Sequence, residues 1–315
     1  MQLCIFSGIF MKKDLLSIRD VSVEDVASLL ETAREIKADI PAYYDVFRGR
    51  TVVLIFDKPS LRTRVTFEVA MRQFGGGSIY IPGKDISLGK RESVSDGARN
   101  LSRWVDGIVM RTFGHEIIVE LASSSTVPVI NALTDLEHPC QALACIQTLK
   151  EHLGNLAGKK MVFVGDGNNV AHSLMLLCPL VGMDFTMCCP PGYEPDDQIQ
   201  EYARSSAFRM HTVYTLEHDP ACAVRGADLI YTDVWASMGQ ECETDARASK
   251  FRKYQVNSVL MAKAGEKALV SHCLPAHREE EITSEVLDSG RSIAYDEAEN
   301  RLHMQKAILY RLLKR

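Results

Sequence analysis

Short apolar runs alternate with amphipathic stretches along most of this 315-residue chain. TVVLIF, which begins at residue 51, is rich in β-branched residues, and the following RTRVTFEVAMRQF repeats its apolar residues at a helical period. The alternation continues through SIYI, GIVMRT and VPVINA, with helical patterns between these runs. A repeated strand–helix–strand order predicts a parallel β-sheet covered by helices.

A second series of the same kind follows the helical stretch 138–152 and the turn GNLAGKK. It starts with MVFVGD and ends with ALVSHCL. The chain is also longer than a single domain usually is, so we expect two α/β domains, 1–153 and 154–297, with a cleft between them. The apolar periodicity of 298–315 needs a surface to pack against, and we expect this last helix to return to the first domain.

Composition narrows the class of protein. Hydrophobic residues make up 46% of the chain and charged residues 24%, as in globular proteins with a full core. The formal net charge is -5 and Lys and Arg form no tract, so no broad surface attracts nucleic acid. No stretch has the length and apolarity of a membrane span. We therefore expect neither nucleic acid nor a membrane as a partner.

The nine cysteines are odd in number, include the neighbours Cys188 and Cys189, and show no zinc-ligand spacing. We therefore predict reduced thiols, a cytoplasmic location and no bound metal. Residues 1–10 are apolar but lack the basic start and the cleavage site of a signal peptide. Because Ser22 is a good helix cap before VEDVASLLETAREI, we expect Met11 to be the native start.

Ligands of open α/β sheets gather beyond the carboxyl ends of the strands, which directs attention to the segments that follow each strand. DKPSLRTR follows TVVLIF. Ser60 is a suitable N-cap, the amides of 61–63 would then point out of a helix start, and Arg62 adds a forked donor. An ordinary capped helix is the alternative. The start of a helix dipole is positive, however, so two arginines in the first turn are unfavourable for an ordinary helix. Their presence therefore favours a phosphate-binding site.

Two further segments place polar groups near the same edge. MRTFGHE puts Arg111 at the end of a buried strand, where a surface ion pair is the alternative. LEHPCQ puts His138 at a cap position before Pro139, with Gln141 one turn into the helix. Ser or Asp would cap this helix better than His, so we predict that His138 hydrogen-bonds a carbonyl oxygen of a substrate.

GDGNNVAHS has only part of a dinucleotide-binding pattern. The third glycine of GxGxxG falls at Val170, and Asp184 begins the next strand, whereas a ribose-binding acid stands at the end of that strand. We interpret the glycines as a tight turn and Asn168 and Asn169 as polar ligand contacts. A nucleotide-dependent oxidoreductase remains an alternative.

TDVWASMGQ and SHCLPAH each end a strand of the second series. Asp233 and Cys273 would then face one crevice, while His272 alternates to the other side of its strand. Cys273 could instead be a small buried hydrophobic residue. A Cys/His hydrolase dyad would require the two side chains to converge, which neighbours on a strand do not do.

These five segments, in this order, resemble the transcarbamylase family from about Asp14 to the C-terminus. The family patterns SxRTR, HPxQ and HCLP stand here as SLRTR, HPCQ and HCLP, and DVWASMGQ together with HCLP is similar to the ornithine-specific branch. The resemblance implies a carbamoyl phosphate site of Ser60, Leu61, Arg62, Thr63, Ser87, Arg111, His138, Gln141, Cys273, Leu274 and Arg301. It implies an L-ornithine site of Asn169, Asp233, Ser237 and Met238.

The resemblance also implies a direct carbamoyl transfer. The side-chain amine of ornithine, with a pKa near that of lysine, ~10.4, attacks only when neutral. Asp233 would position this amine, and Cys273 would relay or accept its proton. Arg111, His138 and the Thr63 hydroxyl would stabilise the oxyanion, and phosphate would leave with the proton. No step needs a cofactor or a metal, although the Cys273 thiol could be caught by zinc as an inhibitor.

Members of the family are typically homotrimers in which the loop PGKDISLGKRES reaches a neighbour's site, so the resemblance implies a phosphate contact by Ser87 across subunits. Ser87 stands where Gln or His is common, which weakens that expectation. Leu61 stands where Thr is frequent and keeps the backbone amide, so phosphate binding is expected to survive.

Other interpretations remain open at this point. One is a transcarbamylase acting on aspartate, putrescine or an acylated ornithine, and Asp233 favours a cationic amine over aspartate. Another is a non-catalytic paralogue, because a fold does not fix a function. We expect L-citrulline for arginine biosynthesis, although the residues leave the reverse direction open.

Overall fold

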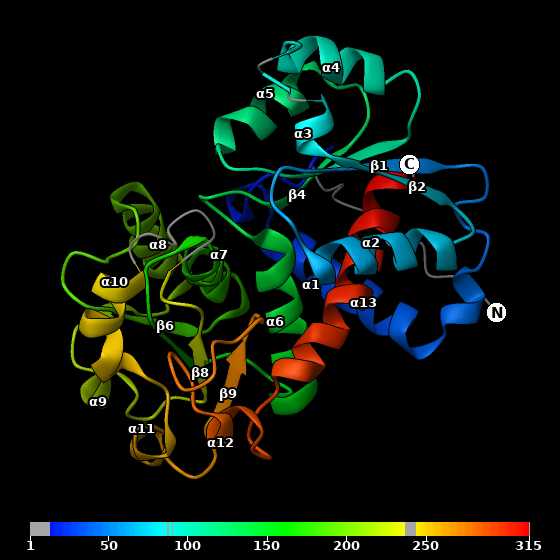
Figure 1. Cartoon of the computed structure of the whole chain (residues 1–315). Helices are drawn as coiled ribbons and strands as arrows, with labels where there is room; N and C mark the ends of the chain where they lie inside the picture. Colours follow the sequence, from blue (N-terminus) through cyan, green and yellow to red (C-terminus); the bar gives the residue numbers. More distant parts are fainter. Residues whose placement is uncertain (1–12, 87, 90, 237–243, 315) are drawn as a thin grey trace.

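The computed structural model describes residues 13–86, 88–89, 91–236 and 244–314. Figure 1 shows two bodies of sheet and helix that lie side by side. The first sheet has four parallel strands in the order β2-β1-β3-β4, and the second has five in the order β7-β6-β5-β8-β9. The expected fold of two helix-flanked parallel sheets is confirmed. The prediction for residues 1–10 and Met11 lies outside the described residues.

The strands coincide with the predicted apolar runs. Their bounds are β1 Thr51–Phe56, β2 Gly77–Pro82, β3 Gly107–Arg111, β4 Val129–Leu133, β5 Lys160–Val164, β6 Asp184–Cys188, β7 Tyr214–Glu217, β8 Leu229–Thr232 and β9 Leu269–His272. Every residue of β3, β4 and β8 is buried, as expected for parallel strands covered by helices on both faces.

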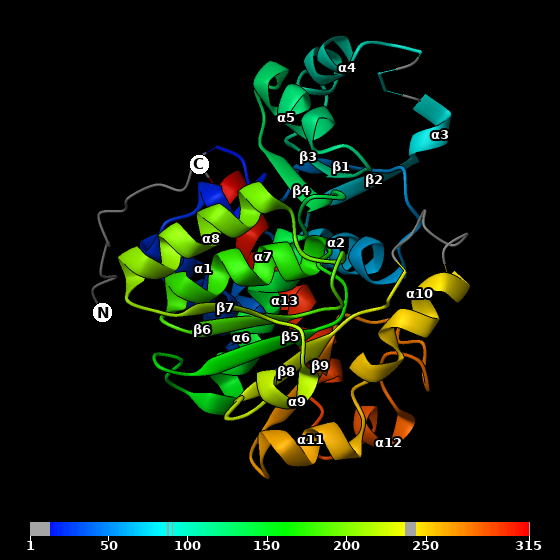
Figure 2. The same cartoon turned by 90° about the vertical axis from the view of Figure 1, so that its left-hand side faces the viewer.

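The helices of the first half are α1 Val23–Ala38, α2 Leu61–Gln73, α3 Gly83–Ile86, α4 Val94–Leu101, α5 His115–Ser124 and α6 Pro139–Leu153. Those that follow are α7 Asn169–Leu177, α8 Asp197–Met210, α9 Pro220–Ala223, α10 Thr244–Phe251, α11 Ser258–Ala264, α12 Ser284–Leu287 and α13 Ala294–Leu313. The turned view in Figure 2 shows α7 and α8 on one face of the second sheet and α9 and α11 on the other.

The register brings the strand ends of each sheet to one edge. Phe56 pairs with Arg111, so β1 and β3 end together. In the second sheet, Thr232 pairs with both Val164 and His272, so β5, β8 and β9 end together. The residues that follow these strands therefore emerge next to one another, at the edge where ligands of such sheets bind.

The last helix, α13, joins the two halves. It packs against α1, α2 and α6 of the first half and contacts β9 of the second, and Figure 1 shows it running beside α6. Its expected return to the first domain is confirmed. The helix begins at Ala294, four residues before the predicted start, and ends at Leu313. Asp296 and Glu297 stand before the predicted start but lie in the first helical turn, where acidic residues are favourable because of the helix dipole.

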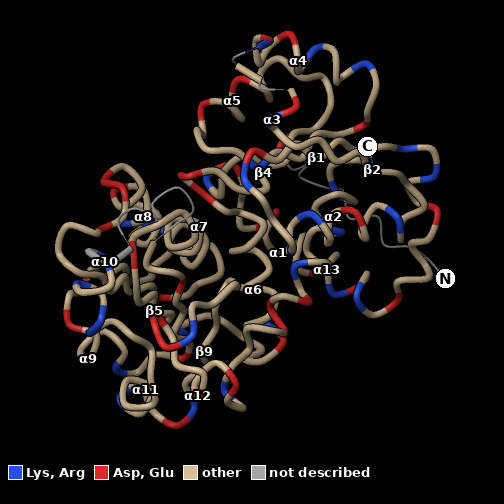
Figure 3. Tube along the Cα trace, viewed as in Figure 1, with Lys and Arg blue, Asp and Glu red and all other residues tan. Residues whose placement is uncertain are grey.

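Charges of both signs alternate along the trace in Figure 3, in agreement with the absence of a basic tract in the sequence. None of the described helices combines the length and the apolar character that a membrane span requires.

Candidate active site

A cavity of about 1070 Å³ lies where the carboxyl ends of the two sheets face each other. Every predicted site residue that the structure describes lines it: Ser60, Leu61, Arg62, Thr63, Arg111, His138, Gln141, Asn169, Asp233, Cys273, Leu274 and Arg301. The other three predicted residues, Ser87, Ser237 and Met238, lie outside the described residues. The fold thus brings together side chains that are up to 241 residues apart in the sequence, from Ser60 to Arg301, of which Arg301 lies on a helix and was expected only from the family resemblance.

The start of α2 forms part of the first wall. The Ser60 hydroxyl accepts a hydrogen bond from the Thr63 amide at 3.2 Å, as predicted for an N-cap. The first turn holds no acidic residue. Arg62 is partly buried, and this burial lowers the pKa of its guanidinium. Helix amides and a guanidinium therefore face the cavity together, which is the chemistry of an anion site.

Arg111 and His138 continue this wall. Arg111 ends β3 and is 7% exposed, and burial lowers its pKa to about 10, with the nearby Arg301 and Arg62 adding to the shift. Burial also holds the pKa of His138 well below its ordinary value, and the same arginines contribute. At neutral pH this wall therefore combines charged guanidinium groups with a neutral imidazole, and a bound anion would relieve the repulsion among the arginines.

Arg301 reaches the cavity from α13. Its Nη2 donates to Thr63 Oγ1 at 2.7 Å, and its Nη1 donates to Gln141 Oε1. Arg301 is 2% exposed, so these hydrogen bonds are largely shielded from solvent. The C-terminal helix thus supplies a cation to the same wall as α2 and α6.

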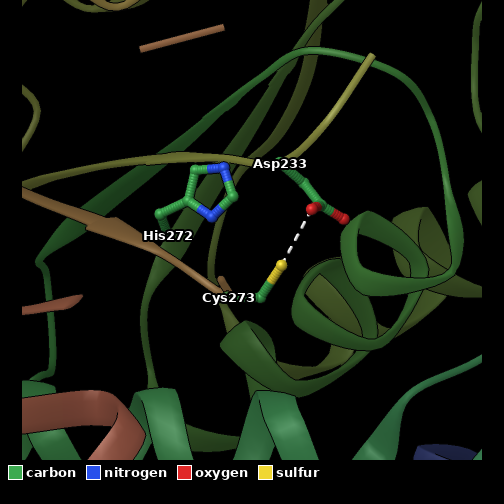
Figure 4. A group of neighbouring side chains, drawn as sticks. All are labelled: Asp233, His272 and Cys273. Atoms are coloured by element: carbon green, nitrogen blue, oxygen red, sulfur yellow. Dashed lines mark hydrogen bonds between the residues drawn. The ribbon is translucent and has the colours of Figure 1, made fainter. Parts of the chain in front are cut away.

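The second wall centres on Asp233 and Cys273. The Cys273 thiol donates to Asp233 Oδ1 at 2.8 Å, as Figure 4 shows, and Asn168 Nδ2 donates to Oδ2 of the same carboxylate at 2.7 Å. The amide of Val234 donates to Oδ1 at 2.8 Å. Burial and the adjacent Asp233 raise the pKa of Cys273 well above its ordinary value, so the residue is a thiol and not a thiolate at neutral pH.

His272 lies closer to this pair than strand alternation predicted, because one of its ring nitrogens is within 4.8 Å of Cys273 Sγ and of an Asp233 carboxylate oxygen, but its ring is hydrogen-bonded to other groups. Its Nε2 lies 2.9 Å from Glu281 Oε1, and its Nδ1 accepts from the Leu274 amide at 2.8 Å. Leu274 has a φ of 55°, a left-handed conformation that a branched side chain rarely adopts. The His272 ring therefore helps to hold the backbone that follows Cys273.

The GDGNN turn is structural in part. Asn168 caps α7 by accepting from the amides of Val170 and Ala171, whereas Asn169 Nδ2 donates to the Thr134 carbonyl of the first half at 2.6 Å. A Cβ atom on Gly167 would lie 2.3 Å from Pro195 N, so only glycine allows the neighbouring loop to approach. This close packing explains the second glycine of the motif without a nucleotide.

Two charged pairs at the cavity were not predicted. Lys58 forms an ion pair with Asp135, and Arg247 Nη1 lies 3.1 Å from Asp166 Oδ2 and donates to the Trp235 carbonyl at 3.0 Å. Lys58, Asp135 and Asp166 follow strands, so the strand-end argument could have found them. Arg247 lies on α10, and no local pattern in the sequence marks it.

Two groups of described residues place three metal-type ligand atoms within 4.8 Å of one another, namely Asp233 with His272 and Cys273, and His277 with Glu280 and Glu281. In the first group, both ring nitrogens of His272 already take part in hydrogen bonds. With these bonds in place only Asp233 and Cys273 could approach an ion, which is fewer protein ligands than a closed zinc site has.

The chain matches two family models. Residues 13–151 match the carbamoyl-P binding domain of aspartate/ornithine carbamoyltransferase, and residues 157–312 match the Asp/Orn binding domain. The ornithine carbamoyltransferase of Methanothermobacter thermautotrophicus is 50% identical over 301 residues, which cover 96% of this chain and 99% of the relative. The anabolic ornithine carbamoyltransferase of Pyrococcus furiosus is 48% identical over 299 residues, which cover 94% and 95%. A solved ornithine carbamoyltransferase from Pyrococcus furiosus superposes with a TM-score of 0.93 at 46% identity and covers 97% of this chain and 98% of that one.

Proposed function

The chain belongs to the aspartate/ornithine carbamoyltransferase family, and from this premise we propose that it transfers the carbamoyl group of carbamoyl phosphate to the side-chain amine of L-ornithine, with L-citrulline and phosphate as products. The observation that carries the proposal is the pairing of two unlike walls in one cavity. Arginines and a helix start face an acid–thiol pair across it. The first wall suits a phosphate, and the second suits a cationic amine.

On the first wall, the amides of 61–63 and the Arg62 guanidinium hold the phosphate, while Arg111, His138 and Gln141 hold the carbamoyl group. A neutral His138 donates a hydrogen bond to the carbonyl oxygen without giving up its proton. Arg111 remains cationic at neutral pH because its lowered pKa of about 10 is still far above 7. Together with the Thr63 hydroxyl, these groups stabilise the oxyanion that forms during attack.

On the second wall, Asp233 and Asn169 bind ornithine, together with Ser237 and Met238. The amine attacks in its neutral form, a new C–N bond forms, the C–O bond to phosphate breaks, and the amine proton leaves with the phosphate. A thiol with a raised pKa already carries its proton, so of the two predicted roles for Cys273 we retain the relay and set aside direct acceptance.

The test is citrulline formation by the purified protein from carbamoyl phosphate and L-ornithine, measured beside aspartate, putrescine and N-acetylornithine as acceptors. A strong preference for ornithine supports the proposal. Activity with another amine only would keep the phosphate site and overturn the acceptor. No turnover with any of the four would favour a non-catalytic paralogue.

Further parts of the proposal concern the setting of the enzyme. We infer a cytoplasmic homotrimer acting in arginine biosynthesis, with Ser87 of one subunit serving the site of its neighbour. The word anabolic in the name of the Pyrococcus furiosus relative supports the direction. The described cysteines are free thiols, in line with a reducing compartment. We place the carbamoyl phosphate domain at 1–153, with 298–315 packed on it, and the ornithine domain at 154–297.

A further inference from the structure

Glu297 lies behind the cavity and does not line it. The residue stands in the first turn of α13, is fully buried at 0% exposure, and accepts three side-chain hydrogen bonds. Gln141 Nε2 and the Tyr231 hydroxyl donate to Oε1 at 2.5 and 2.7 Å, and the Ser271 hydroxyl donates to Oε2 at 2.5 Å. These donors come from α6, β8 and β9. One carboxylate therefore connects both halves of the molecule to the C-terminal helix.

The first consequence is the orientation of the Gln141 amide. A carboxylate can only accept, so Gln141 must present its Nε2 to Glu297 and turn its Oε1 toward Arg301. Arg301 in turn donates to Thr63 Oγ1 at the start of α2. Without the carboxylate the amide could flip and direct its N–H groups at the Arg301 guanidinium. Glu297 thus sets which face of Gln141 a carbamoyl group would meet.

The second consequence concerns the acid–thiol pair. Tyr231 stands two residues before Asp233, and Ser271 stands two residues before Cys273. Side chains two positions apart on extended chain lie on the same side. The bonds from Tyr231 and Ser271 to Glu297 therefore fix both strands just behind the point where Cys273 donates to Asp233. Burial raises the pKa of Glu297, and the three donors and Arg301 counteract this effect.

We propose that Glu297 is a positioning residue of the transferase site, which orients Gln141 toward the carbamoyl group and aligns Asp233 with Cys273 through Tyr231 and Ser271. Its contribution is made by hydrogen bonding and not by contact with a substrate. The inference rests on the proposed function for its effect on turnover, whereas its effect on carbamoyl phosphate binding can be measured without any acceptor.

The test compares Glu297→Leu and Glu297→Gln with a control on the same helix, Glu299→Leu. Glu299 has a side chain that is 59% exposed and pairs with Lys37 at 3.8 Å. Leucine leaves three buried donors without an acceptor, so we expect the dissociation constant for carbamoyl phosphate, from calorimetry without acceptor, to rise about 10-fold and kcat to fall by at least as much. Glutamine should restore both to within about threefold, because its oxygen accepts from Gln141 and Tyr231 while its N–H group donates to Ser271.

A purely structural role would lower the melting temperature of Glu297→Leu and its binding stoichiometry, but not the affinity of the folded fraction. Wild-type affinity and kcat in folded Glu297→Leu, or equal losses in Glu299→Leu, would overturn the inference. If Glu297→Leu does not fold, the double variant Tyr231→Phe with Ser271→Ala replaces it. For this double variant we expect a lower kcat and an unchanged affinity for carbamoyl phosphate. An unchanged kcat would overturn the inference. Absence of citrulline formation in the wild type overturns the proposed function instead.

Discussion

Arg111 holds a guanidinium in an almost buried position, next to two other arginines whose charges lower its pKa. Repulsion among these guanidinium groups favours a bound anion or a developing oxyanion beside them. We expect Arg111→Ala to reduce kcat by about 10²- to 10³-fold, because a charged donor to the oxyanion is lost. The variant should remain folded. Steady-state kinetics and thermal melts followed by circular dichroism check both parts.

His138 gives a companion to this experiment. Its neutral ring should stabilise the oxyanion as a donor only, so His138→Ala is expected to lose turnover to a similar degree without unfolding. The wild-type kcat/KM, which reports the free enzyme, should show no ionisation of His138 near the ordinary histidine pKa of ~6.5, since burial and the nearby arginines hold its pKa well below that value. Unchanged turnover in both alanine variants would refute the roles assigned to these side chains.

At the level of residues, much of the candidate site was predictable from the positions that follow parallel strands. Asp233 and Cys273 were placed in one crevice because both end parallel strands, and they share a hydrogen bond. Arg247 and Glu297 were missed for a different reason. Each lies on a helix, and its role depends on which loops and strands the tertiary fold brings against that helix. Local periodicity carries no information on those neighbours.

At the level of elements, the start of α2 holds a helix cap at the place proposed for the phosphate of the substrate. Ser60→Ala removes the acceptor for the Thr63 amide, and we expect it to lower the free energy of unfolding by about 1 kcal/mol and to raise the KM for carbamoyl phosphate. Ser22→Ala is the matched control, because Ser22 caps α1 through the Asp25 amide at 3.1 Å. It should show a similar loss in chemical denaturation with an unchanged KM. Equal KM values for carbamoyl phosphate in both variants would show that Ser60 acts only as a helix cap.

Helix α13 carries a buried charge that does not serve the site. Lys306 is 0% exposed, its Nζ has no hydrogen-bond partner within the described part of the chain, and burial lowers its pKa to about 8. Below that pH the folded protein holds a buried cation that makes no hydrogen bond within the described residues and lies 6.0 Å from the centroid of the Phe74 ring. We expect Lys306→Met to raise the free energy of unfolding at pH 7 by about 1–3 kcal/mol, as measured by urea denaturation.

The pH dependence of the unfolding free energy tests the effect of Lys306 independently. Between about pH 8 and 10.5 the unfolded chain binds a proton at Lys306 that the folded protein does not, so this residue makes stability rise with pH in that window. Lys306→Met should remove this part of the increase in unfolding free energy with pH. Lys263→Met, at an exposed position on α11, should keep it. A slope that is the same in all three proteins would show that Lys306 is solvated or paired.

The types of the elements were predictable from periodicity, whereas the start of α13 and the helices that pack against it were not. The runs TVVLIF and GIVMRT form the buried strands β1 and β3, since β-branched residues in short apolar runs favour this structure. The start of α13 was placed four residues late because charged residues near a helix start resemble a polar loop. The buried positions of polar residues on α13 follow from its place between α1, α2 and α6, which the sequence pattern does not encode.

At the scale of the whole molecule, helices α6 and α13 run through the junction between the halves, and their buried residues belong to one continuous core with residues of both sheets. The cavity therefore has two walls on a shared support. Such a support lets the walls meet at a defined distance, which a flexible linker between two domains would not provide.

The first half also exposes apolar side chains that a monomer leaves in water. Val65 on α2 is 46% exposed, and Ile79 on β2 is 50% exposed and comes three residues before the loop that the family resemblance brings to a neighbouring subunit. If these side chains lie in a subunit contact, Val65→Lys with Ile79→Lys should convert a trimer to monomers in sedimentation equilibrium and reduce activity, because Ser87 would no longer reach a neighbour's phosphate. Val259→Lys, at a 67% exposed position on α11, should leave a trimer intact. A wild-type protein that is monomeric and fully active would refute both the proposed trimer and the proposed intersubunit role of Ser87, because a complete site would then be present within one chain.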